Sequence, residues 1–515
     1  MLAVQDGAVY SAGLEDEAFL ALLANEAAEK RCFDAKPLYR ACFAHGLAAQ
    51  NITFDAKLAA YLLNPAASDY TVARLAAEYG VRPAFSAPWP EAGVLEELCA
   101  VLREKCDAEG MGKLLDDIEF PLCEVLASME HIGILVDRNG IEAFGQELQT
   151  ALGAELRAIY DEVGYEFNVN SPKQLGKALF EDLGLPTRKK TKSGYSTNAE
   201  TLESLRDYSP VIGHILQYRT YQKLNSTYVE GLLKVVGADG RIHSTFNQTE
   251  TRTGRISSGE PNLQNIPVRT ELGSRFRKYF IAPQGETLLD ADYSQIELRL
   301  LAHISGDEAM CEAFRSGADI HRSTAARIYG LPPEQVTPAL RSSAKAVNFG
   351  IVYGISDFSL AQDIGVTRKE AGEFIKTYLD TYPGVKKYME DIKQTGREQG
   401  YVTTLFGRRR ALPELKSKNF NMRSFGERVA MNTPIQGTAA DIIKIAMVRV
   451  RDRLLRDGLQ SRLILQVHDE LILEAPKDEQ ETAMHLLTEE MENAFRMDAP
   501  LVAEAKAGHS WYDAK

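Results

Sequence analysis

The chain has 515 residues, too many for one hydrophobic core, and its length predicts three or four domains. Hydrophobic residues make up 44% of it and charged residues 25%, as is typical of globular proteins in water. We find no apolar run near the roughly 18 residues of a membrane span and no secretory-signal pattern at the start. These features exclude an integral membrane protein, and we expect a cytoplasmic one.

The net charge of −13 argues against a protein that binds nucleic acid through an overall basic surface. Cations could still be concentrated in a cleft, and two basic clusters are candidates, although clusters of this size are more often solvated loops. They are Arg188-Lys189-Lys190 with Lys192, and Arg408-Arg409-Arg410. The six cysteines show no Cys-x-x-Cys spacing, so we expect reduced thiols, with neither a zinc site nor a disulfide framework.

The first part of the chain, to about residue 115, alternates short apolar runs with Ala-rich stretches and predicts an α/β domain, with a strand at the start, Met1–Val4. From about 120 to 240 the pattern predicts long helices that pack as a bundle with a basic tip. The helices are expected at Phe120–Met129, Ile141–Val163 and Thr201–Val236. Further on, Pro332-Pro333 and Tyr382-Pro383-Gly384 are expected to separate helices.

Two acidic positions far apart in the sequence lie at the ends of predicted strands. Asp292 follows the strand pattern Thr287–Ala291 and precedes a helix that begins near Ile296. Asp469 lies near the bend of a hairpin predicted over residues 463–473, beside His468 and Glu470. Acidic pairs near turns are usually only solvated. Two carboxylates that converge could, however, hold paired Mg²⁺ ions for in-line phosphoryl chemistry.

Between these positions a four-residue repeat predicts a functional helix face. Arg341, Lys345, Phe349 and Tyr353 recur every four residues, so on a helix they form one stripe about 18 Å long. The two cations suit a triphosphate, and the two rings suit the flat faces of a sugar and a base. The alternative is a helix whose aromatic residues pack in the core and whose cations are solvated.

These three segments resemble motifs A, B and C of bacterial family A DNA polymerases, the DNA polymerase I group, at residues 292–299, 341–354 and 466–470. The resemblance extends from about residue 120 to the end of the chain. Other stretches that carry it are Thr253-Gly254-Arg255, Pro261-Asn-Leu-Gln-Asn-Ile-Pro-Val-Arg269, Asp319-Ile320-His321 and Gln436-Gly-Thr-Ala-Ala-Asp441.

The resemblance implies a multidomain α/β and α protein: a right-hand polymerase with palm, fingers and thumb, preceded by a degenerate, truncated 3′–5′ exonuclease-like (RNase H-like) α/β domain. The expected domains are 1–115 exonuclease-like, 116–240 thumb, 241–302 palm, 303–430 fingers and 431–515 palm again. The Asp-x-Glu strand that proofreading needs is expected to be missing. We interpret Asp34 and Asp55 as surface or capping residues and expect no proofreading.

The resemblance also assigns roles around the expected metal site. Asp292 and Asp469 would bind two Mg²⁺ ions, for which Mn²⁺ could substitute, together with the Tyr293 carbonyl, and Glu470 would be an auxiliary acid. For the incoming nucleotide, Glu297 would crowd the sugar 2′ position, and the Phe349 ring would favour discrimination against dideoxynucleotides. The other expected nucleotide-binding residues are Gln295, His321, Arg341, Lys345 and Tyr353, the last near the templating base.

For DNA, the resemblance implies that Arg255, Gln295 and Gln436 contact minor-groove acceptors, which lie at nearly the same positions in all correct base pairs. His468 would support the primer terminus, although it and His321 could equally be structural histidines. The remaining expected DNA contacts are Asn262, Gln264 and Asn265 and the basic thumb loop with Arg188, Lys189, Lys190 and Lys192.

The function implied is a DNA-directed DNA polymerase, a nucleotidyltransferase of replication and repair, that extends primer-template DNA with deoxynucleoside triphosphates and acts as a monomer. A single-subunit RNA polymerase is one alternative, disfavoured by Glu297 and by the stretches Thr253-Gly254-Arg255 and Pro261–Pro267. A catalytically inactive DNA-binding subunit is another. It is disfavoured because both metal acids and the complete helix stripe are present.

Overall fold

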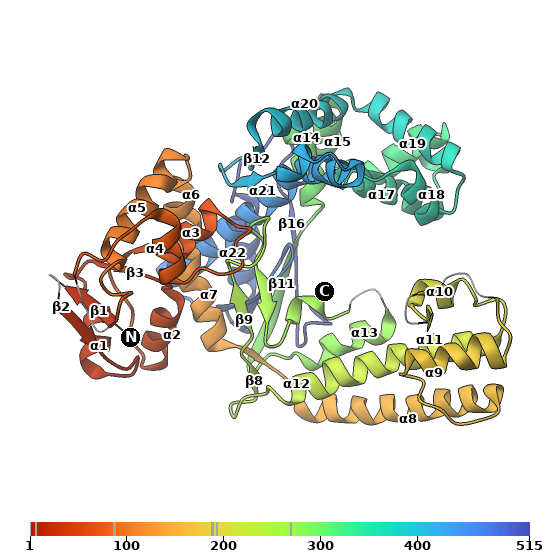
Figure 1. The fold of residues 1–515 in the computed structure, drawn as a ribbon, viewed down its shortest axis with the longest axis horizontal. Helices are drawn as coiled ribbons and strands as arrows, with labels where there is room; N and C mark the ends of the chain where they lie inside the picture. Colours follow the sequence, from red (N-terminus) through yellow and green to blue (C-terminus); the bar gives the residue numbers. More distant parts are fainter. Residues whose placement is uncertain (1, 6–7, 86–88, 187–189, 192–193, 268–269) are drawn as a thin grey trace.

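The computed structural model describes residues 2–5, 8–85, 89–186, 190–191, 194–267 and 270–515. An N-terminal α/β part lies to one side of a central antiparallel sheet, and two groups of helices extend from the other side (Figure 1). In the parts of the chain just given, no helix is both long enough and apolar enough to cross a membrane.

The N-terminal part is α/β, as predicted. Strands β1 and β2 form a hairpin, and β3 and β4 pair in parallel. Cys123 and Ala127 of helix α7 also belong to its core. All six cysteines of the chain are buried, and none forms a disulfide. The elements are β1 Leu2–Gln5, β2 Ala8–Ser11, α1 Glu17–Ala24, β3 Lys30–Cys32, α2 Lys36–Ala44, β4 Ile52–Asp55, α3 Ala56–Leu63, α4 Val72–Tyr79, α5 Leu95–Ala108, α6 Gly112–Leu114 and α7 Phe120–Ile132.

The sequence analysis interprets Asp55 as a surface or a capping residue. Asp55 caps helix α3 but is not on the surface. Its carboxylate is only 1% exposed. It accepts hydrogen bonds from the backbone N–H groups of Lys57 and Leu58 at the start of α3, at 2.8 and 3.2 Å. The Asp34 carboxylate forms an ion pair with Lys57 at 2.7 Å. Both carboxylates therefore already have partners within this domain.

The next part is helical, and its helices α8 and α11 pack side by side (Figure 1). The single helix predicted over residues 201–236 is wrong. Ser209 caps a new helix at Pro210, where the missing N–H of proline is tolerated only in the first turn. The elements are β5 Ile134–Leu135, α8 Arg138–Val163, α9 Pro172–Lys177, β6 Lys190–Thr191, β7 Gly194–Tyr195, α10 Ala199–Glu203, α11 Pro210–Lys223, a π-helical turn Leu224–Glu230 and α12 Gly231–Leu233.

The central sheet has four strands in the order β14-β15-β11-β16, and all neighbouring strands are antiparallel. Strand β11 is buried along almost all of its length because helices cover the sheet, among them α22. The elements of this part are β8 Arg241–Ile242, β9 Thr245–Asn247, β10 Ser257–Gly259, α13 Glu271–Arg275, β11 Glu286–Tyr293, β14 Arg462–Val467, β15 Glu470–Pro476, α22 Gln480–Glu492 and β16 Ala503–Gly508.

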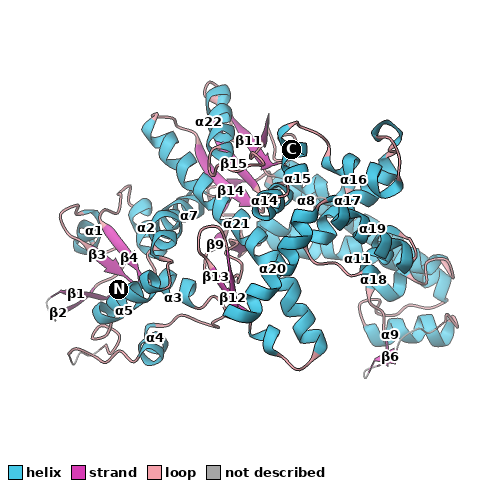
Figure 2. Cartoon of the chain, turned by 90° about the horizontal axis from the view of Figure 1, so that it is seen from above, coloured by secondary structure: helices cyan, strands magenta, loops and turns pink. Residues whose placement is uncertain are grey.

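A second group of helices is inserted between β11 and β14 (Figures 1 and 2). Its breaks fall at the predicted prolines, because α19 ends before Pro383 and α20 begins at it. Helix α21 crosses the expected boundary at residue 430 without interruption. The elements are α14 Ile296–Ser305, α15 Glu308–Arg315, α16 Ile320–Tyr329, α17 Pro338–Val352, α18 Asp357–Ile364, α19 Arg368–Thr381, α20 Pro383–Gln399, β12 Tyr401–Thr403, β13 Arg409–Ala411 and α21 Phe420–Arg456.

Arg408 corrects one expectation about the basic clusters. Its side chain is buried and pairs with Asp441 at 2.6 Å and with Glu119. A guanidinium that is enclosed by two carboxylates is not available to a DNA phosphate. The neighbouring Arg409 pairs with Glu109 at 3.1 Å. Arg408 and Arg409 therefore hold parts of the protein together.

Candidate active site

The sheet brings the two predicted metal acids together. In the register of β11 against β15, Asp292 lies opposite Glu470, the residue after Asp469. The backbone N–H of Tyr293 donates a hydrogen bond of 3.1 Å to the carbonyl of Asp469. The turn between β14 and β15 thus places Asp469 next to the end of β11, where Asp292 lies.

Two residues with left-handed backbone conformations flank this pair. Gln295, at the start of α14, has φ +55°, and His468, in the β14–β15 turn, has φ +57°. Such conformations are unfavourable for residues other than glycine and tend to persist at functional sites. The Gln466 side chain donates a 2.6 Å hydrogen bond to the His468 carbonyl and so fixes the turn.

The electrostatics of the pair suit a divalent cation. Burial and the nearby charge of Asp292 raise the pKa of Asp469 to about 7, and burial also raises the pKa of Asp292. One carboxylate oxygen of Asp292, Oδ1, is buried without a hydrogen-bond partner. The described residues contain no group of three or more His, Cys, Asp or Glu side chains that could hold a metal. Two carboxylates are nevertheless a usual protein contribution to Mg²⁺.

Tyr293 can serve the site only through its backbone. Its side chain is buried, and its hydroxyl donates a 2.7 Å hydrogen bond to the Met491 carbonyl in α22. This contact anchors the end of β11 against α22. The anchoring is consistent with the expected use of the Tyr293 carbonyl.

Glu470 is more enclosed than a freely available auxiliary acid. It accepts a 2.6 Å hydrogen bond from the indole N–H of Trp511, and it pairs with Arg277 at 3.4 Å and with Lys515. The Lys515 ammonium also lies 3.2 Å from Asp292 Oδ2. Arg277, Trp511 and Lys515 carried no local signal in the sequence that pointed to this site.

Asp290 is a further acid that the sequence reasoning missed. It lies two residues before Asp292, so both side chains project from the same face of β11, a spacing that could have revealed it. Asp290 is 3% exposed. Burial and the neighbouring Glu470 carboxylate raise its pKa to about 9. The raised pKa favours the neutral, protonated form of Asp290.

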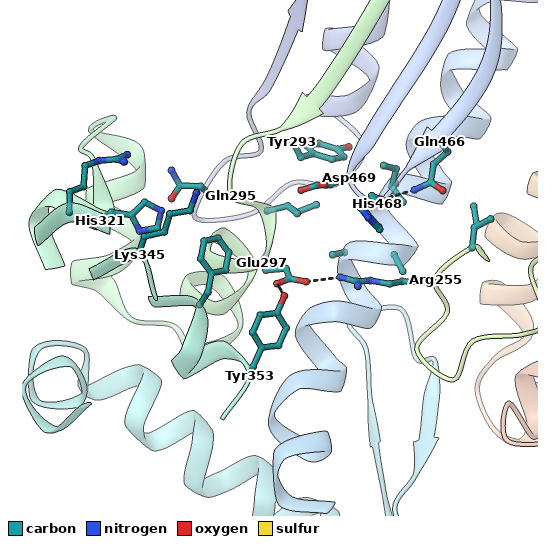
Figure 3. Close-up of a pocket in the computed structure, with 17 residues that line it drawn as sticks. Arg255, Tyr293, Gln295, Glu297, His321, Lys345, Tyr353, Gln466, His468 and Asp469 are labelled. Atoms are coloured by element: carbon teal, nitrogen blue, oxygen red, sulfur yellow. Dashed lines mark hydrogen bonds and ion pairs between the residues drawn. The ribbon is translucent and has the colours of Figure 1, made fainter. Parts of the chain in front are cut away.

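A cleft of about 510 Å³ lies beside this pair (Figure 3). It is lined from one direction by the β14–β15 turn and from the other by helices α16 and α17. All seven predicted nucleotide-binding residues line it. The predicted residues that line it are Arg255, Tyr293, Gln295, Glu297, His321, Arg341, Lys345, Phe349, Tyr353, His468 and Asp469.

The predicted stripe is present on α17. Arg341, Lys345 and Phe349 lie on the helix, and Tyr353 follows its last residue. The Lys345 ammonium lies 6.0 Å from the centre of the Phe349 ring, and Arg341 pairs with Asp319 at 2.6 Å. Phe349 contacts the main core and also lines the cleft. The stripe therefore serves packing and the cleft together.

His321 is held in one orientation by buried neighbours. The Asn348 side-chain amide donates a 2.8 Å hydrogen bond to its Nδ1, and Thr324 donates one of 3.1 Å to the Asn348 oxygen. Nδ1 is then the acceptor, so the proton lies on Nε2. Burial and the nearby Arg341 cation lower the pKa of His321 to about 4. At neutral pH His321 offers the cleft a neutral N–H donor.

Glu297 is the meeting point of three elements (Figure 3). It accepts hydrogen bonds from Arg255 at 2.8 Å and from the Tyr353 hydroxyl at 2.6 Å. With its amide oxygen turned toward Arg255, Gln436 accepts hydrogen bonds of 3.0 and 3.1 Å from the same guanidinium. Arg255, Gln436 and Glu297 thus form one connected group at the edge of the cleft.

Among the remaining expected DNA contacts, Asn262, Gln264 and Asn265 are not part of the cleft lining. Gln264 donates a 3.0 Å hydrogen bond to Gln466 of β14, and the Asn262 side chain caps a short turn. Asn265 is exposed. Of the basic thumb loop, Arg188, Lys189 and Lys192 lie outside the described residues, and only the backbone of Lys190, in β6, is described.

Comparison with known proteins agrees with this fold. The family model described as DNA polymerase family A matches residues 138–513, and the model described as DNA polymerase I, ribonuclease H-like domain, matches residues 6–84. The chain therefore belongs to DNA polymerase family A, with an N-terminal ribonuclease H-like domain. Both the expected family and the expected fold class are confirmed.

Individual relatives can be named from the same comparison. The chain is 49% identical to DNA polymerase I of Geobacillus stearothermophilus over 525 residues, covering 98% of this chain and 60% of the relative. It is 48% identical to DNA polymerase I of Bacillus subtilis, again covering 98% of this chain and 60% of the relative. It thus spans about 60% of the length of these relatives.

A solved structure is also similar over nearly the whole chain. It is titled the POL domain of Pol1 from M. smegmatis in complex with DNA primer-template and dNTP. The two share 41% sequence identity with a TM-score of 0.91, and the match covers 96% of this chain and 88% of the other.

Proposed function

We propose that the chain is a DNA-directed DNA polymerase that extends a primer 3′-hydroxyl with deoxynucleoside triphosphates. The observation that carries this proposal is the convergence of Asp292 and Asp469 beside a cleft whose opposite wall presents Arg341 and Lys345. The related solved structure, titled as a complex with primer-template and dNTP, supports the same substrates.

The charges are arranged for nucleotidyl transfer. Two Mg²⁺ ions, or Mn²⁺ in their place, held by Asp292, Asp469 and the Tyr293 carbonyl would supply the Lewis acidity that activates the hydroxyl and neutralises the phosphate. On the opposite wall Arg341 and Lys345 bind the triphosphate, and His321 donates a hydrogen bond from Nε2. Glu297 limits the space near the sugar, and Phe349 and Tyr353 offer ring faces.

The domain roles follow from the same proposal. Residues 1–115 form the exonuclease-like domain, 116–240 the thumb, 241–302 and 431–515 the palm and 303–430 the fingers. The thumb and fingers would hold primer-template DNA between them, with Arg255, Gln436 and His468 near the primer terminus. We further propose that the enzyme acts as a monomer in the cytoplasm, in replication and repair.

The alternatives are weaker for specific reasons. A single-subunit RNA polymerase needs room for a 2′-hydroxyl, and the carboxylate of Glu297 is fixed in the cleft by Arg255 and Tyr353. An inactive DNA-binding subunit would not need both metal acids, three triphosphate-binding side chains and a buried, unpartnered Asp292 oxygen at one cleft.

Primer extension with Mg²⁺ and separate deoxy- and ribonucleotide pools tests the proposal. Asp469→Asn should lower the extension rate at least about 100-fold because a metal ligand is lost, while duplex binding changes little. The matched control is Asp478→Asn, an exposed residue in the turn after the same strand, β15, which should extend normally. Extension by Asp469→Asn at the parental rate would contradict the proposed mechanism.

A further inference from the structure

The loop between β9 and β10, residues 248–256, carries Arg255 to the cleft and is held by the N-terminal domain. Tyr61 of α3 is fully buried, and its hydroxyl donates a 2.8 Å hydrogen bond to the Thr251 carbonyl. The Thr251 hydroxyl in turn donates a 2.7 Å hydrogen bond to the Arg255 carbonyl. Two hydrogen bonds thus connect the core of the N-terminal domain to the backbone of Arg255.

The first residue of the loop has a second connection. The Gln248 side chain is 5% exposed and donates hydrogen bonds of 2.9 Å to both the carbonyl and the carboxylate of Glu119. Glu119 ends the segment that follows α6, and its neighbours Leu115 and Ile118 belong to the N-terminal core. Gln248 and Thr251 of the loop are therefore held by Tyr61 of the N-terminal domain and by Glu119 in the segment that directly follows this domain.

Glu119 belongs to a buried, charge-balanced cluster. Lys444 of α21 pairs with it at 2.6 Å, and Arg408 bridges it to Asp441, 2.6 Å away. Burial alone would raise the pKa of Glu119, but the Lys444 and Arg408 cations lower it to about 2. Two carboxylates and two cations thus fix α21 to the N-terminal domain directly behind the loop.

Arg408 also packs against the loop itself. Gly254, next to Arg255, has φ +84°, and a Cβ at this position would lie 2.5 Å from Nε of Arg408. Only glycine allows both this backbone conformation and this close approach. Gly254 therefore packs directly against Arg408 of the ionic cluster.

We propose that Tyr61 and Glu119 are positioning residues for Arg255, so that the N-terminal domain contributes to the recognition of correct base pairs by the polymerase site. The inference rests on the proposed function. It gives this domain a role that is independent of any nuclease chemistry. Tyr61 acts through the hydrogen bonds of Thr251, and Glu119 acts through Gln248 and Arg408.

The test compares Tyr61→Phe with a matched control, Tyr70→Phe. Both tyrosines are buried in the N-terminal core, but the Tyr70 hydroxyl donates its 2.8 Å hydrogen bond within that domain, to the Asn64 carbonyl. The readout is a ratio: kcat/KM for extension from a normal terminal guanine, divided by that from 3-deazaguanine, which lacks the minor-groove N3 acceptor.

The parent enzyme should show a ratio well above one, and Arg255→Ala should bring it close to one. Tyr61→Phe should reduce the ratio about three- to tenfold, the equivalent of one net hydrogen bond, whereas Tyr70→Phe should leave it unchanged. A general loss of stability would slow both primers equally and leave the ratio as it was. A parental ratio in Tyr61→Phe would overturn the inference.

A double variant tests whether the effect of Tyr61 depends on Arg255. If Tyr61 acts through Arg255, Tyr61→Phe should lower kcat/KM for the normal primer in the parent background but not in the Arg255→Ala background. A further reduction of the same size there would refute the inference. Failure of the parent enzyme to extend any primer would instead refute the proposed function, so the two failures are distinguishable.

Discussion

The Glu297 carboxylate is held in one position in the cleft by two hydrogen bonds. Glu297 is 8% exposed, and its carboxylate is occupied by Arg255 and Tyr353, each from a different element. A carboxylate that accepts hydrogen bonds from both sides cannot move aside for an additional hydroxyl without breaking at least one of them. In the proposed function, Glu297 therefore couples the choice of sugar to the orientation of Arg255.

Replacing Glu297 by alanine should increase ribonucleotide incorporation. The shortened side chain leaves room for the 2′-hydroxyl, and relief of one unfavourable buried polar contact corresponds to at least about a tenfold change. The measurement is the ratio of kcat/KM for a ribonucleotide to that for the matching deoxynucleotide. Glu297→Gln keeps the size of the side chain and should stay near the parental ratio. An unchanged ratio in Glu297→Ala would refute the assignment.

A second prediction concerns Phe349. A ring hydroxyl at this position could replace the missing 3′-hydroxyl of a dideoxynucleotide as a hydrogen-bond donor to the phosphates. Phe349→Tyr should therefore lower discrimination against dideoxynucleotides by about 10- to 100-fold, as for a hydrogen bond to a charged group. Chain termination at graded dideoxynucleotide ratios measures it. Phe358→Tyr, on the exposed face of α18, is the control, and equal termination by both variants would contradict the prediction.

At the scale of elements, α21 joins regions that the sequence assigned to separate domains. Its 37 residues run from exposed Phe420 to Arg456 and carry Gln436 to the cleft edge, while Asp441 and Lys444 enter the buried ionic cluster. Pro434 lies inside the helix without ending it. A continuous helix with a buried ionic contact links the cleft and the N-terminal domain rigidly.

Removing Lys444 should therefore destabilise the protein. Lys444→Met leaves Glu119 buried with one cation fewer, which costs about 3 kcal/mol for a broken buried pair. Because the pKa of Glu119 is lowered to about 2, its contribution is present above its ordinary pKa of 4.5 and is lost as pH falls toward 2. The difference in free energy of unfolding between parent and variant should thus be largest near neutral pH.

Urea unfolding at pH 7, 5 and 3 measures this difference. The control is Lys387→Met, because the Lys387 ammonium pairs with Asp391 at 3.1 Å on an exposed helix face, where an ion pair contributes about 0–1 kcal/mol. A variant of Lys444 that unfolds at the same urea concentration as the Lys387 control would show that the buried cluster contributes little.

At the scale of the whole molecule, the N-terminal domain is joined to the polymerase part by polar contacts at several points. Besides Tyr61 and Glu119, the Lys36 ammonium of α2 lies 2.6 Å from Glu130 and 2.7 Å from the Phe246 carbonyl. Asp34 and Asp55, by contrast, form contacts within their own domain. Polar side chains of the N-terminal domain thus hold segments of the polymerase part in place.

The chain should accordingly lack proofreading. On a 5′-labelled primer with a mismatched 3′ end, incubated with Mg²⁺ and no nucleotides, the primer should keep its full length. The carboxylates of Asp34 and Asp55 are engaged by Lys57 and by backbone N–H groups, so they are not available to hold two metals. Shortened primers that disappear in Asp34→Ala would contradict this expectation.

Local elements of the site could be predicted from the sequence because they depend on neighbouring residues. Short runs of apolar residues predicted the strand before Asp292 and the hairpin at Asp469, and the four-residue repeat predicted the stripe on α17. The break at Ser209-Pro210 was also encoded locally, as a cap followed by proline, but it was overlooked in a long helical pattern. Backbone propensity and side-chain periodicity are short-range properties.

The sequence by itself therefore determined the family, the main secondary-structure elements around the site and which two acids are the candidates for metal binding. Only the tertiary structure decided which distant charged and polar groups lie together: Lys515 beside Asp292, Trp511 against Glu470, and Arg408 between Glu119 and Asp441. The physical reason is that a charged residue has the same local pattern whether it is solvated or paired. Its partner is selected by the packing of the whole chain.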